Sequence, residues 1–160
     1  MANEQRKKIG IIGLGPVGMI LAVHLREAGC DVIICDNDKI KINQIRNEGI
    51  KLENVIQKSA RFENICSSAK ELLEQNPDYV FMSLKTYQVE NVLKEVPSTN
   101  TSIFISAQNG IDTEQIFSEK FGDQRTIRMV INFAGNLTAS NAVKVTFFNP
   151  PNYLACLDDS

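Results

Sequence analysis

The chain has 160 residues, of which 43% are hydrophobic and 22% are charged. This balance is typical of a single globular domain with a buried core, and it excludes a disordered or membrane-embedded chain. The formal net charge is -2 at pH 7, so the sequence lacks the basic footprint that a nucleic acid partner requires.

The residues that most often bind metals are few and do not cluster. The four cysteines, Cys30, Cys35, Cys66 and Cys156, form no C-x-x-C pair and have no zinc spacing. In a domain of this size they are most simply buried, reduced thiols. His24 is the single histidine and falls in an expected helix, where a packing or surface role is favoured over that of a ligand. We therefore expect no metal site.

An uncharged stretch near the start, Ile9 to Val23, follows basic residues and could be read as a secretory signal or a membrane span. Glycines and Pro16 interrupt it, it leads into charged Arg26 and Glu27, and no small-residue cleavage site follows the apolar run. It is also shorter than the roughly 20 apolar residues that span a bilayer. We expect instead a cytoplasmic protein without a membrane partner.

The same stretch reads consistently as a strand, a glycine-rich turn and a helix. The β-branched run Ile9–Ile12 is typical of a buried parallel strand. The motif GLGPVG follows and is a complete G-x-G-x-x-G. Its first glycine permits a tight turn, its second lets a pyrophosphate approach the backbone, and its third lets the next helix pack closely on the sheet. The expected cofactor-binding loop consists of Gly13, Leu14, Gly15, Pro16, Val17 and Gly18.

The helix after this turn, Pro16–Glu27, would present free N–H groups and a positive dipole end to phosphates, and Gly29 would end it. A second strand, Asp31–Cys35, leads to Asp36. An acid about 20 residues beyond the last glycine of such a motif accepts hydrogen bonds from the adenosine ribose hydroxyls. The glycine motif alone also occurs in ordinary turns, but this order of elements predicts a dinucleotide-binding site.

Strands and helices continue to alternate along the rest of the chain. Asp38 is the expected N-cap of a helix over 39–47, and Ser67 or Ser68 caps a helix over 68–76. The stretch from Gly49 to Ile65 is either a small hairpin of 50–52 with 60–62 or an irregular edge. The alternation predicts an α/β fold of the Rossmann type, a doubly wound, mainly parallel sheet with helices on both faces. The other expected elements are strands over 79–84, 102–106, 126–133 and 143–148, and helices over 87–96 and 111–121, the last with Asp112 near its start.

In such a sheet the ligand crevice lies outside the carboxyl ends of the strands. Two loops should overhang it, one beginning at Lys85 and one containing Asn109. A lysine could hold a carboxylate or a ribose hydroxyl, and an asparagine donates and accepts hydrogen bonds without titrating. The alternatives are an exposed lysine at a strand end and an ordinary Asn-Gly turn. Their joint position at the crevice favours functional roles, whereas Gln88 is equally well explained by helix capping.

Three segments, "GLGPVG", "SLKTYQVE" and "AQNGI", resemble the amino-terminal domain of the ketopantoate reductase (2-dehydropantoate 2-reductase) family. The resemblance covers essentially the whole chain, and its K-x-x-Q and Q-N-G elements are more specific than the glycine motif. It implies reduction of a 2-keto acid to a 2-hydroxy acid with a nicotinamide cofactor, a step of pantothenate biosynthesis. It also implies catalytic-site roles for Lys85, which would anchor cofactor and substrate, and for Asn109, which would lie near the nicotinamide and the keto acid.

The segment Asp36-Asn37-Asp38 departs from the family pattern. The family commonly uses NADPH and holds its 2′-phosphate with an arginine after the second strand. A carboxylate at this place would repel a phosphate and suit a free hydroxyl. Lys39 and Lys41 would partly offset the repulsion. We therefore expect NAD or NADP as cofactor, with NAD favoured.

The family continues into a helical carboxy-terminal domain that carries a lysine general acid and a substrate-binding glutamate. This chain stops at "NPPNYLACLDDS", so neither role can be assigned here. We expect residues 1–149 to form the dinucleotide-binding domain and residues 150–160 to begin the hinge, which would leave the chain inactive by itself. Tyr153, Leu154 and Cys156 form either an apolar patch that promotes a homo-oligomer or a last strand on the sheet.

Two alternatives to the reductase reading stay open. The chain could be a stand-alone nucleotide-binding sensor or interaction module without catalysis. It could also belong to a dehydrogenase of the 6-phosphogluconate or glycerol-3-phosphate type, although the Lys85 and Asn109 loops suit those classes less well.

Overall fold

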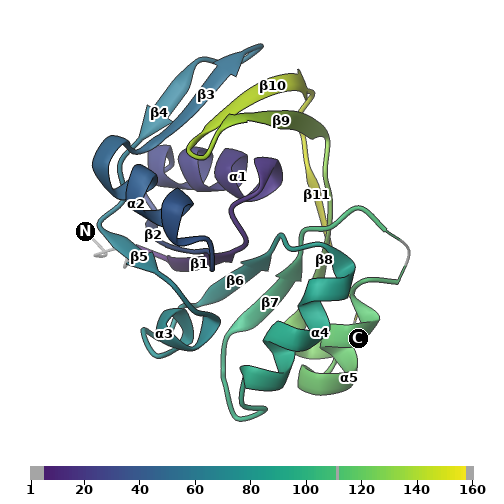
Figure 1. Ribbon diagram of the computed structural model, residues 1–160. Coiled ribbons are helices and arrows are strands. Elements are labelled where there is room, and N and C mark those ends of the chain that lie inside the picture. The colour runs from purple at the N-terminus through teal and green to yellow at the C-terminus, as the bar shows by residue number, and fades with distance from the viewer. Residues whose placement is uncertain (1–5, 111, 158–160) are drawn as a thin grey trace, which may run out of the picture.

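A seven-stranded sheet forms the centre of the computed structural model, which describes residues 6–110 and 112–157 (Figure 1). Its strand order is β11-β8-β7-β6-β1-β2-β5. All neighbouring strands pair in parallel except β11, which runs antiparallel to β8. The strands are β1 (Lys8–Ile12), β2 (Asp31–Cys35), β5 (Asn64–Cys66), β6 (Tyr79–Met82), β7 (Ile103–Ser106), β8 (Thr126–Val130) and β11 (Tyr153–Cys156). The prediction of a mainly parallel Rossmann-type sheet is confirmed.

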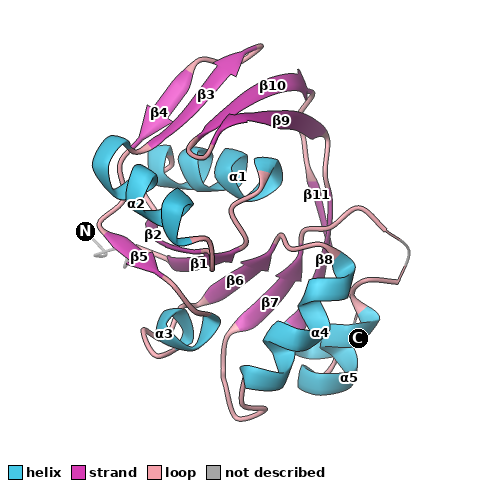
Figure 2. Cartoon of the chain, viewed as in Figure 1, coloured by secondary structure: helices cyan, strands magenta, loops and turns pink. Residues whose placement is uncertain are grey.

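Helices cover both faces of this sheet (Figure 2). Alternate residues of each strand point to opposite faces, so Ile11 packs in one core with the first two helices while Ile12 packs in a second core with the last three. This division is the doubly wound arrangement that the sequence predicts. The helices are α1 (Pro16–Glu27), α2 (Lys39–Glu48), α3 (Ala69–Leu73), α4 (Thr86–Glu95) and α5 (Gln115–Phe121), with a short 3-10 turn at Asp123–Arg125.

A second sheet, which the sequence analysis did not predict, lies across α1 on the side away from the main sheet (Figure 1). It has four strands in the order β4-β3-β10-β9. Phe133, Val143 and Val145 of this sheet share a core with α1. The strands are β3 (Ile50–Asn54), β4 (Lys58–Ala60), β9 (Phe133–Ala139) and β10 (Ala142–Phe148). Of the two readings left open for 49–65, the hairpin is the correct one, since β3 and β4 pair antiparallel. Its second strand covers 58–60, however, and not the predicted 60–62.

The strand predicted over 126–133 is correct only as far as Val130, because the chain then changes sheets. β8 ends at Val130 in the main sheet, and β9 begins at Phe133 in the second. Asn132 lies between them, where its backbone N–H donates to Asn152 Oδ1 at 2.8 Å and its side chain donates to the Pro151 carbonyl at 2.7 Å. These bonds replace the ladder bonds of a continuous strand.

Two helices are shorter than predicted. Asp112 has a φ of 57°, which a right-handed helix does not allow, so α5 begins only at Gln115; Ile111, the predicted first residue, lies outside the described residues. α3 ends at Leu73, and Asn76 has a φ of 51°. The caps are predicted correctly, since the Asp38 carboxylate accepts from two N–H groups of α2 and Ser68 caps α3.

The cysteines differ in burial, although all four are free thiols. Cys35 and Cys66 are buried as predicted, but Cys30 is half-buried and Cys156 is exposed on β11, an edge strand. His24 stacks on Phe148 with ring centroids 5.0 Å apart, which is a packing role. Of the two readings for the end of the chain, Tyr153–Cys156 does form a last strand, and its residues are all exposed. Among residues 6–110 and 112–157, no helix is long and apolar enough to cross a membrane.

Candidate functional site

The three glycines of the turn between β1 and α1 differ in how far the surrounding protein requires a glycine at each position. Gly13 has a φ of 96°, which favours glycine, and a Cβ there would come within 2.8 Å of Leu84. A Cβ on Gly18 would lie 1.9 Å from the Gly13 carbonyl oxygen. A Cβ on Gly15, in contrast, would meet no described atom within 4 Å. Packing therefore explains two of the glycines, and the third leaves open space beside the backbone.

This open space lies at the start of α1. Gly15 is the N-cap and has no side chain to satisfy the N–H groups of the first turn, and no acidic residue lies in that turn. The free N–H groups and the positive end of the helix dipole suit an anion such as a phosphate. Leu14 buries its side chain completely, while Pro16 occupies the first helical position, where its missing N–H costs nothing.

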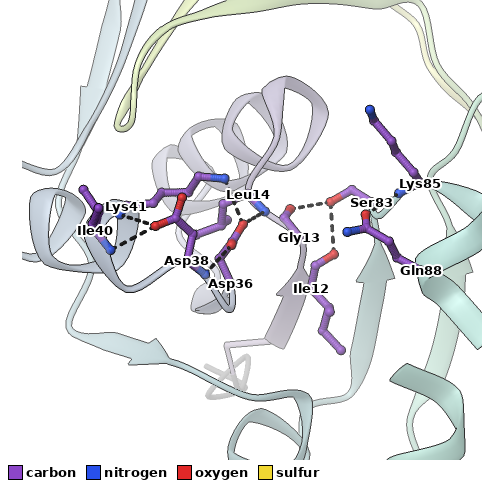
Figure 3. A network of polar contacts seen from close by, with 10 residues as sticks. All are labelled: Ile12, Gly13, Leu14, Asp36, Asp38, Ile40, Lys41, Ser83, Lys85 and Gln88. Atoms are coloured by element: carbon purple, nitrogen blue, oxygen red, sulfur yellow. Dashed lines mark hydrogen bonds and ion pairs between the residues drawn. The ribbon is translucent and has the colours of Figure 1, made fainter. Parts of the chain in front are cut away.

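Asp36 follows β2 and bonds to the same turn (Figure 3). Its Oδ2 atom accepts from the Leu14 N–H at 2.8 Å and from Lys41 Nζ at 3.1 Å, and its Oδ1 atom accepts from the Asp38 N–H at 3.0 Å. The carboxylate therefore fixes the glycine turn to α2. An ionised carboxylate has about four acceptor positions, so these three bonds leave one of them for a ligand hydroxyl.

Ser83, just after β6, ties a neighbouring strand to the glycine turn. Its hydroxyl lies 2.7 Å from the Gly13 carbonyl and 3.2 Å from that of Ile12, and it donates to them (Figure 3). The sequence analysis did not identify this role. The available clue was a small polar residue at the carboxyl end of an otherwise buried strand.

Lys85 and Gln88 begin α4. The Lys85 backbone N–H donates to Gln88 Oε1 at 3.4 Å, so the capping interpretation of Gln88 is the one the structure supports. The Lys85 side chain is exposed, and its ammonium end points away from Gln88 (Figure 3). It is therefore available to a ligand.

Asn109 is exposed in the loop after β7, and the residue before it joins that loop to the one that carries Lys85. Gln108 is buried, and its Nε2 atom donates to the Leu84 carbonyl at 2.7 Å. Its Oε1 atom accepts from the Ser106 hydroxyl at 3.2 Å. A buried carboxamide thus fixes the two loops that carry Lys85 and Asn109 relative to each other, a link that sequence reasoning missed.

Arg128 of β8 supports the Asn109 loop from its other end. It donates to the Gly110 carbonyl at 2.6 Å and forms an ion pair with Glu114. The loop is therefore anchored on both sides of Asn109.

A cavity of about 520 Å³ opens at the carboxyl ends of β1, β2 and β5. Gly13, Asp36 and Gln88 line it together, whereas Lys85 and Asn109 do not. Burial raises the pKa of the Cys35 thiol, which also faces the cavity, to about 12, so this side chain adds no charge to the cavity near pH 7. The other lining residues are Ile12, Asn37, Ser67, Ser68, Ala69, Leu84, Tyr87, Asn91, Val92 and Glu95.

A family model matches most of the chain. The model described as "Ketopantoate reductase PanE/ApbA" matches residues 9–158. The 2-dehydropantoate 2-reductase of Archaeoglobus fulgidus is 26% identical over 113 residues, which are 71% of this chain and 36% of that protein. A glycerol-3-phosphate dehydrogenase [NAD(P)+] of Clostridium botulinum is 26% identical over 133 residues, which are 78% of this chain and 39% of that protein.

Solved structures share the fold. D-mandelate dehydrogenase in complex with NADH superposes with a TM-score of 0.77 at 22% identity, over 95% of this chain and 48% of that chain. The 2-dehydropantoate 2-reductase of Geobacter metallireducens GS-15 superposes with a TM-score of 0.72 at 20% identity, over 86% of this chain and 45% of that chain. The chain therefore spans less than half the length of each of these four relatives.

Proposed function

Because this chain belongs to the ketopantoate reductase PanE/ApbA family, we propose that it is the cofactor-binding part of an oxidoreductase that reduces ketopantoate or a related 2-keto acid. The observation that carries the proposal is the open space at Gly15. The packing of the protein requires glycine at positions 13 and 18. It does not require one at Gly15, where an added Cβ would meet no described atom within 4 Å. A pyrophosphate that contacts the backbone supplies that requirement.

The remaining parts of a dinucleotide find suitable groups around this point. The adenosine half would enter the cavity of about 520 Å³ beside Asp36, whose carboxylate retains one acceptor position for a ribose hydroxyl. The nicotinamide half would extend the other way, towards the exposed side chains of Lys85 and Asn109. This direction follows the rule that ligands cross the carboxyl ends of the strands in an open α/β sheet.

When bound, the cofactor would supply the hydride that reduces the keto carbon. Lys85 would hold the substrate carboxylate or a ribose hydroxyl with its ammonium group. Asn109 would orient the keto acid with a carboxamide that does not change charge with pH. Gln108 keeps the two loops together through its 2.7 Å bond to the Leu84 carbonyl, so the two side chains would act at a fixed separation.

Isothermal titration calorimetry of the chain with NADH, NADPH and ADP-ribose tests the proposal. We expect saturable binding of all three, because each carries the pyrophosphate and adenosine. Nicotinamide mononucleotide, which lacks both, is the matched control and should bind far more weakly. Failure of both dinucleotides and of ADP-ribose to bind would refute the cofactor site. Reduction of ketopantoate by the protein that carries this domain would exclude the alternative of a sensor without catalysis.

A further inference from the structure

The ion pair between Asp36 and Lys41 alters the electrostatics of the ribose end of the site. Lys41 Nζ lies 3.1 Å from Asp36 Oδ2, and the two side chains are only 13% and 10% exposed. Because the pair is partly buried, dissolved salt screens its interaction less than it screens that of a surface pair. An approaching anion therefore meets a neutralised pair rather than an isolated carboxylate.

Asp36 does not depend on Lys41 for its position. Two backbone N–H groups, those of Leu14 and Asp38, bond its two oxygens at 2.8 and 3.0 Å. The carboxylate would stay in place if the lysine ammonium turned elsewhere. The Lys41 stem is flexible, while its backbone N–H is fixed to Asp38 Oδ1 at 3.1 Å in the first turn of α2.

From this geometry we infer that Lys41 is a specificity-determining residue that binds the 2′-phosphate of NADPH, so that the site accepts both NADH and NADPH. The inference rests on the proposed function. With NADH bound, Lys41 remains paired with Asp36, and the carboxylate accepts one ribose hydroxyl. With NADPH bound, the ammonium moves to the 2′-phosphate.

Lys39 offers a matched control. It lies in the same first turn of α2 and carries the same charge, but its side chain is exposed, and the Asp36 carboxylate pairs with Lys41 instead. A general effect of positive charge would involve both lysines. A specific contact would involve Lys41 alone.

The test compares dissociation constants for NADH and NADPH by calorimetry in the wild type, Lys41→Met, Lys41→Arg and Lys39→Met. We expect Lys41→Met to weaken the binding of NADPH at least about tenfold more than that of NADH, because one charge-assisted bond to the phosphate is lost. Lys41→Arg should retain NADPH binding, and Lys39→Met should leave the ratio within about threefold of the wild type. Equal weakening of both cofactors by Lys41→Met, or equal effects of Lys39→Met and Lys41→Met, would overturn the inference.

Two additions separate the possible failures. The double variant Asp36→Asn with Lys41→Met removes both charges, so it keeps the test valid if the single variant leaves Asp36 destabilised. A ³¹P titration of bound NADPH reads the 2′-phosphate directly, and its second pKa, about 6 when free, should be lower on the wild type than on Lys41→Met. If the wild type binds neither dinucleotide, the proposed function fails. If the wild type binds NADH but Lys41→Met leaves the ratio of the NADPH and NADH dissociation constants unchanged, only this inference fails.

Discussion

Replacing Gly15 with alanine should separate the cofactor site from the fold. The added Cβ would meet no described atom within 4 Å, and the backbone, with φ of -78° and ψ of -171°, is open to alanine. Alanine is a poorer N-cap than glycine by about 1 kcal/mol, and it restricts the unfolded chain, which favours folding by about 0.4–1 kcal/mol. We therefore expect the free energy of unfolding to change by less than about 0.5 kcal/mol.

Cofactor binding should respond much more strongly to the same change. The methyl group would fill the space through which a pyrophosphate reaches the backbone N–H groups of the turn. Loss of one charge-assisted hydrogen bond costs about 1.5–3 kcal/mol, which corresponds to binding that is about 10- to 150-fold weaker. NADH and NADPH should weaken equally, because the pyrophosphate is common to both.

Gly18→Ala is the control for effects on the fold. Its Cβ would lie 1.9 Å from the Gly13 carbonyl oxygen and 2.7 Å from Ser83 Oγ, so backbone must move. Overpacking of this kind lowers the free energy of unfolding by about 1–3 kcal/mol. Urea denaturation gives the free energy of unfolding of each variant, and calorimetry gives its dissociation constant for NADH. The reasoning is refuted if Gly15→Ala binds NADH as the wild type does, or if it destabilises the protein as much as Gly18→Ala.

Two further changes probe the loops and the cavity wall. Gln108→Leu leaves the Leu84 carbonyl without its donor, which should lower the free energy of unfolding, measured in urea, by about 1–3 kcal/mol. The control Gln115→Leu, at an exposed position, should change it by less than about 0.5 kcal/mol. Similar losses for both variants would contradict the role of Gln108. Burial raises the pKa of the Cys35 thiol from 9.0 to about 12, so only the unfolded chain ionises it just above pH 9, and the stability from burying the neutral thiol is lost as pH rises from 9 to 12. Cys35→Ala should therefore lose less stability over that range than the wild type, whereas Cys156→Ala, at an exposed position, should follow the wild type; parallel curves for Cys35→Ala and the wild type would refute this.

The first strand, turn, helix and second strand could be predicted from the sequence because local patterns determine them. The predicted bounds of α1 (Pro16–Glu27) and β2 (Asp31–Cys35) agree with the structure. The glycine motif determines where the helix starts, Gly29 adopts a positive φ just beyond its end, and a β-branched run marks the strand. These features act over only a few residues.

The second sheet was not predicted because it depends on pairing between distant segments. β3 pairs in parallel with β10, about 90 residues further along the chain, and no local pattern encodes that partnership. A clue was nevertheless present in the sequence of α1, where no residue from Gly18 to Val23 is polar or charged, and all six are buried in the structure. A helix that is apolar on all sides must be covered on all sides, so a second layer over α1 could have been expected.

At the candidate site, the sequence identified positions but not partners. It placed the glycine turn and Asp36 at one edge of the sheet, where the structure also has them. It did not identify the bonding roles of Gln108 or Ser83, because a polar residue near a strand end bonds whichever loop the fold brings beside it. Their partners, the carbonyls of Leu84 and Gly13, lie 24 and 70 residues away in the chain.

Asp36 shows why a residue's partners matter to the cofactor rule. An acid after the second strand favours NAD because a free carboxylate accepts ribose hydroxyls and repels a phosphate. Here the carboxylate accepts from Leu14 and Asp38 and pairs with Lys41 at 3.1 Å. Its charge is therefore largely compensated before any cofactor arrives, and its first task is to hold the glycine turn. The position of the acid can be read from the sequence, but which of the two nearby lysines pairs with it is seen only in the structure.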